Sequence, residues 1–132
     1  MVDSRSLWPD DITYRAVPTP IVVLREQAAL LGPMTKNILQ ADVWTRASED
    51  GTRIVHTFAL VAPALDNYTY PLFDASHDPV RVYPVLLAPA DEQPWEVSDE
   101  EGLRRSLGLI LRSPRTRDAI VALLAQSQAV AV

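Results

Sequence analysis

The first regular pattern of apolar positions lies between Pro20 and Leu31 and has the spacing of a helix. Thr19 is a preferred N-cap residue and proline suits the first helical position, so the helix is expected to begin at Pro20. Gly32-Pro33 is expected to end it. Four apolar residues fall within a stripe of about 80°, which is wide enough for a core-facing side: Ile21, Leu24, Ala28 and Leu31.

Two further apolar residues, Val23 and Leu30, project together on nearly the opposite side of this helix. A surface helix with a single core contact does not require them. The second side is therefore expected to be covered by another element of the chain, by a second copy or by a foreign protein. Val23 and Leu30 are the first candidate interaction residues.

Four runs rich in apolar residues predict strands: 36–48, 52–63, 67–75 and 80–87. Glu49-Asp50-Gly51 joins the first two, and its glycine suits the left-handed position of a hairpin loop. His77-Asp78-Pro79 joins the second two. Pro71 and Pro84 lie within that second pair, and because proline donates no ladder hydrogen bond, each predicts an edge strand or a bulge. Residues 12–17 alternate and predict a further short strand.

Two helices are predicted in the C-terminal third. Ser98 and Glu101 have capping-box spacing, with Ser98 as the N-cap, and Ser113-Pro114 separates the two helices. Short connections favour strands that follow one another in the sheet, with the helices on one face. The sequence thus predicts an α+β fold, with an antiparallel four- to five-stranded meander sheet, one N-terminal helix and two C-terminal helices. Residues 1–11 are expected to form a flexible arm and residues 12–128 a single domain.

Composition narrows the function classes. The 132 residues include no cysteine, which excludes disulfides and thiolate metal sites. A net charge of −5 argues against general nucleic-acid binding, which depends on Lys and Arg opposite phosphate. Eleven of the 12 basic residues are arginine, as in proteins of GC-rich bacterial genomes. The sequence shows neither an export signal nor an apolar run of about 20 residues, so a cytoplasmic protein without a membrane segment is expected.

Residues with catalytic potential are few. His77 lies near Asp74 and Asp78, and with His56 these residues form the one grouping that suggests a metal or a general base. Their spacing matches no standard ligand pattern, and hydrogen bonding within a turn accounts for them. The four glycines form no phosphate-binding loop, and no serine lies in a nucleophile elbow. We therefore expect no catalytic residue, no cofactor and no stoichiometric transition metal, and a binding protein in preference to an enzyme.

Side chains suited to recognition are more numerous. Three arginines project opposite the apolar stripes of the C-terminal helices: Arg105, Arg112 and Arg115. They are candidates for binding an acidic partner, because arginine makes paired hydrogen bonds to carboxylates, and a solvated surface is the alternative. Tyr68 and Tyr70 share one side of their strand, and with His77 they are a candidate pocket between sheet and helices. Cross-strand packing is the alternative for the tyrosines.

These features favour a non-enzymatic protein-binding module, either an inhibitor of the immunity or antitoxin type, an adaptor or a chaperone, which acts through surface complementarity. A homodimer is a further possibility. In its size and acidic charge the chain resembles bacterial immunity proteins, antitoxin-like inhibitors and secretion chaperones, a resemblance that rests on no shared motif. The alternative is a small-molecule-binding protein or a cryptic enzyme, with a pocket between the sheet and the helices.

Overall fold

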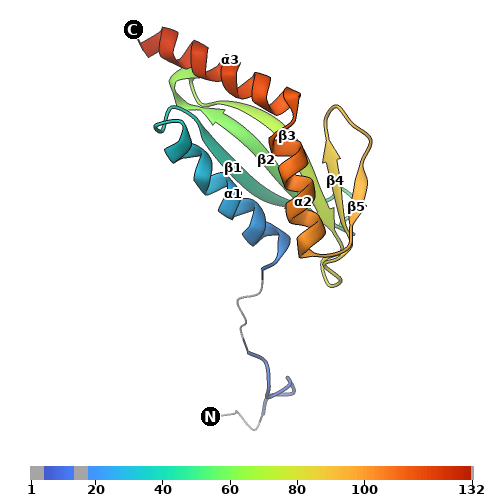
Figure 1. Ribbon diagram of the computed structural model, residues 1–132. Coiled ribbons are helices and arrows are strands. Elements are labelled where there is room, and N and C mark those ends of the chain that lie inside the picture. Colours follow the sequence, from blue (N-terminus) through green and yellow to red (C-terminus); the bar gives the residue numbers. More distant parts are fainter. Residues whose placement is uncertain (1–4, 14–17, 132) are drawn as a thin grey trace.

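The computed structural model describes residues 5–13 and 18–131. It confirms the expected α+β meander, in which a helix is followed by five strands and two further helices (Figure 1). The elements are α1 (Pro20–Met34), β1 (Gln40–Ala47), β2 (Ile54–Ala62), the short 3-10 helix η1 (Pro63–Leu65), β3 (Tyr68–His77), β4 (Val85–Pro89), β5 (Trp95–Val97), α2 (Glu100–Leu111) and α3 (Pro114–Ala131).

The five strands form one sheet in chain order, and each strand pairs antiparallel with the next. All three helices lie on one face of this sheet (Figure 1). Because successive residues of a strand point to opposite faces, β2 directs Phe58 and Leu60 toward the helices and Thr57 away from them. The hydrophobic core therefore lies between the sheet and the helices. Within it, the rings of Phe58 and Phe73 stack with centroids 5.2 Å apart.

A β-bulge interrupts β3 beside Pro71, as one of the two sequence alternatives for that proline predicts. Phe58 pairs with Phe73 and Ala59 pairs with Pro71, so Leu72 is an extra residue in the register. The edge-strand alternative is wrong for Pro71, because β3 lies in the middle of the sheet. The guanidinium of Arg115 in α3 donates to the carbonyl of Leu72 at 2.9 Å and to that of Pro71 at 3.1 Å. These hydrogen bonds attach α3 to the sheet at the bulge.

The first helix ends later than predicted. It continues through Gly32-Pro33 to Met34, and the amide of Thr35 closes its last turn by donating to the carbonyl of Leu31 at 3.1 Å. The chain then turns through two residues with left-handed backbone, Lys36 and Asn37. Proline is tolerated at this position because only the last turn of the helix follows it.

The start of α2 also differs from the prediction. Its N-cap is Asp99 and not Ser98, because the carboxylate of Asp99 accepts a hydrogen bond from the amide of Gly102 at 2.7 Å. Glu101 does not return to the cap but pairs with Arg105 one turn further along. The strand β5 was not among the predicted runs, because three residues are too few to show alternation.

Two more predictions concern the ends of strands. Pro84 does not lie within a strand but directly precedes β4, after a cis peptide bond with Tyr83. The strand expected at 12–17 falls partly on residues 14–17, which lie outside the described residues. Ile12 and Thr13 belong to no strand.

Gly51 has the left-handed backbone expected of the β1–β2 loop, with φ of 73°. Alanine in this conformation costs about 1–2 kcal/mol, so Gly51→Ala is expected to lower the free energy of unfolding by that amount. Gly108→Ala is the matched control, because Gly108 lies inside α2, where the nearest side-chain atom would be 3.8 Å from the new Cβ. This control is expected to stabilise the protein by up to about 1 kcal/mol. Urea unfolding measures both changes, and equal signs would contradict the assignment of the turn.

Candidate functional site

The helices α1 and α2 diverge along their length (Figure 1). A groove lined by residues of α1, α2, α3 and the sheet lies between them. Val23 and Leu30 lie two turns apart on the same side of α1, yet Val23 is fully buried and Leu30 is 53% exposed. Near Val23 the two helices are joined by Arg104 of α2, whose guanidinium lies 3.1 Å from the carboxylate of Glu26 in α1. Val23 is therefore a core residue, whereas Leu30 belongs to an open stretch of the same helix side.

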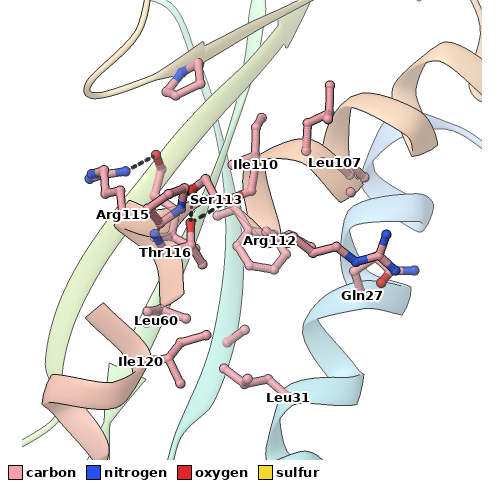
Figure 2. Close-up of a pocket in the computed structure, with 18 of the residues that line it drawn as sticks. Gln27, Leu31, Leu60, Leu107, Ile110, Arg112, Ser113, Arg115, Thr116 and Ile120 are labelled. Atoms are coloured by element: carbon pink, nitrogen blue, oxygen red, sulfur yellow. Dashed lines mark hydrogen bonds between the residues drawn. The ribbon is translucent and has the colours of Figure 1, made fainter. Parts of the chain in front are cut away.

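The groove has a volume of about 1150 Å³ and a mostly apolar lining, which also includes the acidic residues Asp91 and Glu92. Leu31 of α1 and Ile120 of α3 line it from opposite sides, and Leu60 of the sheet lies next to Ile120 (Figure 2). Two further lining residues lie at the surface, Met34 with 79% and Leu109 with 68% of their area exposed. An apolar depression of this size on a small domain is typical of a binding site.

Four arginines line the groove: Arg104, Arg105, Arg112 and Arg115. Arg104 and Arg115 hold elements of the fold together. Arg104 contacts Glu26 and also Glu100, at 2.9 Å, and these acidic partners raise the pKa of its guanidinium. Arg115 donates to the two carbonyls at the bulge and packs over the ring of Tyr70. Arg115, which the sequence suggested as an interaction residue, therefore holds α3 to the sheet, and its guanidinium is less available to a partner.

The other two arginines are more available. Arg105 pairs with Glu101 at 3.3 Å, but both side chains are largely exposed, so the pair contributes little. Arg112 forms no ion pair within the part of the chain that the structure describes. It extends from the end of α2 toward Gln27 of α1, across the groove (Figure 2). The groove thus combines an apolar lining with a cation able to bind a carboxylate.

The tyrosines lie at a second, smaller hollow between β3 and α3, with a volume of about 690 Å³. Tyr68 is 51% exposed there, and Tyr70 is partly covered by Arg115. His77 does not line this hollow, because it lies at the other end of β3. The structure therefore brings together Tyr68 and Tyr70 of the expected pocket and places His77 elsewhere.

His77 instead forms a buried pair with His56. Their Nε2 atoms are 2.9 Å apart, and their side chains are on neighbouring strands beneath the helices. The Nδ1 atom of His77 lies 2.9 Å from the carbonyl of Asp78, which only accepts, so this nitrogen carries a hydrogen. With both rings neutral, His56 then donates to His77 through Nε2 and accepts the hydroxyl hydrogen of Thr45 at Nδ1, over 2.8 Å. Every ring nitrogen of the pair has a partner.

Burial of the ring, together with the nearby His77 and Arg25, lowers the pKa of His56 to about 4. The carboxylates of Asp74 and Asp78, which the sequence suggested as companions of these histidines, have other partners. Asp74 accepts from Thr57 at 2.7 Å on the opposite face of the sheet, and Asp78 accepts from two backbone amides of its own turn. No group of three or more potential metal ligands occurs among the described residues.

The edge of the sheet at β1 is less suited to binding than the groove. At the outer strand β1, the carboxylate of Asp42 accepts the hydrogen of the Val43 amide at 2.9 Å. That amide points away from β2, because Ser48 and every second residue before it in β1 bond to β2. A charged side chain on an outward backbone donor opposes the addition of another strand.

Comparison of the chain with protein-family models, with curated proteins and with solved structures gives no match. None of the helices in the described ranges is both long and apolar enough to cross a membrane. The candidate site consequently rests on geometry. Two of the candidate interaction residues, Leu30 and Arg112, line the groove. Leu31 and Ile120 also line it but were not candidates, because the sequence pattern assigned Leu31 to the core stripe and gave no signal that Ile120 faces a groove.

Proposed function

We propose that the protein is a protein-binding module whose groove between α1, α2 and α3 receives a short apolar segment of a partner. The observation that carries this proposal is the contrast along one side of α1. Val23 is covered within the chain, while Leu30, on the same side, is left at an open apolar groove. Grooves between helices recognise apolar residues presented at regular spacing by a partner segment.

The positive charges at the groove indicate which residues the partner segment carries. Arg112 reaches across the groove without an acidic partner among the described residues, and Arg105 has only an exposed one. We propose that the partner segment carries Asp or Glu beside its apolar residues, so that a carboxylate binds Arg112. An inhibitor of the immunity type, an adaptor and a chaperone all fit this description, and the cytoplasmic setting expected from the sequence is part of the proposal.

The hydroxyl groups of Ser113 and Thr116 in the groove lining have structural partners, which favours a binding role for the groove over a catalytic one. The Thr116 hydroxyl donates to the carbonyl of Ile110 at 2.8 Å, and the Ser113 hydroxyl oxygen accepts from the Thr116 amide at 3.3 Å. Both hydroxyls therefore serve the junction of α2 and α3.

The test is selection of random 12-residue peptides displayed on phage against the purified protein. Peptides with apolar residues and at least one carboxylate are expected to be enriched. Arg112→Glu is expected to weaken their binding about 10-fold or more, measured by fluorescence polarisation, because it replaces an attraction by a repulsion. Arg117→Glu makes the same charge change at an exposed residue of α3 outside the groove and is expected to leave binding unchanged.

Equal weakening by the two variants would show a general charge effect and contradict the proposed site. The proposal also fails if no peptide is enriched but sodium dodecanoate raises the melting temperature of the wild type and not of Arg112→Glu. In that case the groove binds a small apolar acid, which is the alternative function expected from the sequence.

A further inference from the structure

The N-terminal arm carries the same chemistry that the groove is suited to bind. In residues 5–13 the apolar side chains of Leu7, Trp8 and Ile12 are 100%, 77% and 67% exposed. Asp10 and Asp11 lie between Trp8 and Ile12. Three large apolar residues exposed together on a short segment are unusual on a soluble surface and mark a segment that binds elsewhere.

We infer that this arm is an occupant of the groove and docks there in cis, as an internal competitor of the partner segment. The apolar side chains of Leu7, Trp8 and Ile12 match the lining formed by α1, α3 and the sheet. The carboxylates of Asp10 and Asp11 carry the charge that would bind the guanidinium of Arg112. This inference rests on the proposed binding function of the groove and names a ligand for it within the chain itself.

The length of the chain permits this docking. Leu30 lies 10 residues after Pro20, which is about 15 Å along α1. Ile12 lies eight residues before Pro20, and eight residues span up to about 26 Å when extended. Ile12 can therefore reach the level of Leu30 when the chain folds back along α1, and Trp8 can reach beyond it.

The effective concentration of a tethered arm favours its docking in the groove of the same molecule over docking in a second copy. The short connection between the arm and α1 holds the arm at an effective concentration on the order of 1 mM, well above a protein concentration in the micromolar range. An arm with a dissociation constant of about 0.1 mM for the groove would then be docked about 90% of the time. A partner segment would bind about 10-fold more weakly than it binds a chain whose arm is undocked.

Docking is tested by a spin label attached to Ser6→Cys, the only cysteine in the variant chain. Amide signals of Leu31 and Leu109 at the groove are expected to broaden, while those of Trp44 and Leu86 on the opposite face of the sheet keep their intensity. Arg112→Glu is expected to restore the groove signals, and adding Asp10→Arg and Asp11→Arg to it is expected to broaden them again. Unchanged groove signals in the first sample would overturn the inference.

Mixing labelled chains with isotope-enriched, unlabelled chains separates the two modes of docking. Broadening in this mixture would show that the arm enters a second copy, and the cis inference would be wrong. Broadening only in the uniformly labelled sample supports it.

Competition is tested in the full chain with Leu7→Ser and Trp8→Ser. This double variant is expected to bind the phage-selected peptide about 10-fold more tightly than the wild type, and a synthetic peptide of residues 5–13 is expected to reverse the gain. The matched control is Ser6→Ala with Pro9→Ala. Unchanged affinity of the double variant would overturn the arm inference while leaving the groove as a peptide site. Loss of all peptide binding to wild type and variant would instead count against the proposed function.

Discussion

Val23→Glu is expected to unfold the protein, whereas Leu30→Glu is expected to leave it folded. Val23 is fully buried between α1 and its neighbours, so glutamate there places an unpaired charge in the core and removes an apolar side chain. The cost is on the order of 4–5 kcal/mol or more, comparable to the whole stability of a small domain. Leu30 is 53% exposed, and its replacement is expected to change stability by less than about 1 kcal/mol.

Circular dichroism during thermal unfolding measures the contrast. The matched control for Leu30→Glu is Val121→Glu, which makes the same change at a 59% exposed apolar residue of α3 outside the groove. Light scattering on Leu30→Glu tests the homodimer, since a smaller mass than the wild type would show that a second copy covers this side of α1. Similar melting temperatures for Val23→Glu and the wild type would contradict the packing of α1 against α2.

The sequence predicted most of the architecture because every α-helix and every strand except the short β5 carries a local signal. Thr19 and Pro20 mark the start of α1, and the expected left-handed position at Gly51 is observed. The end of α1 was misplaced, because Gly32-Pro33 is a common stop signal, yet Thr35 satisfies the last turn beyond it. Boundaries of this kind depend on which of several nearby residues supplies the hydrogen bond, and the sequence alone does not rank them.

The groove was only half predictable. The helical projection placed Val23 and Leu30 together on a second side of α1, away from the expected core stripe. In the structure Val23 is fully buried in the same core as Leu24, whereas Leu30 is 53% exposed. The projection did not show that the rest of the chain covers Val23 and leaves Leu30 exposed. That difference depends on how α1 packs against the sheet and against α2, which follows it in the sequence only after all five strands. The same holds for Arg115, whose partners at the bulge are 43 and 44 residues away.

The contact between the two histidines could not be predicted from the sequence, for a related reason. His56 and His77 are 21 residues apart, and their contact depends on the register of β2 with β3. In that register His56 faces Ala75, and His77 faces Ile54, so the two rings meet on a diagonal. The bulge at Leu72, which precedes His77 in β3, shifts this register by one residue, and no spacing rule applied to the sequence would include it.

The buried pair makes the stability of the protein depend on pH between about 4 and 6.5. In the folded chain the pKa of His56 is lowered to about 4, while in the unfolded chain a histidine keeps its ordinary value of 6.5. Above pH 6.5 the ring is neutral in both states, and the fold keeps its full stability. As the pH falls below 6.5, the unfolded chain takes up a proton that the folded chain does not, so unfolding becomes more favourable. The loss is expected to reach about 2 kcal/mol at pH 5 and about 3 kcal/mol near pH 4.

Urea unfolding at pH 7 and pH 5 measures this loss, and His56→Gln identifies its source. Glutamine still offers an acceptor to Thr45 and a donor to His77 but does not titrate, so the variant is expected to lose much less stability between the two pH values. Asp50, whose pKa hydrogen bonds from Ser48 and Thr52 lower to about 2, loses its contribution only below its ordinary value of 3.8 and so lies outside this window. An equal loss in the variant and the wild type would assign the pH dependence to other groups. A smaller loss in the variant would show that the cost of charging a buried imidazole, and not the net charge of the chain, sets the lower pH limit of the fold.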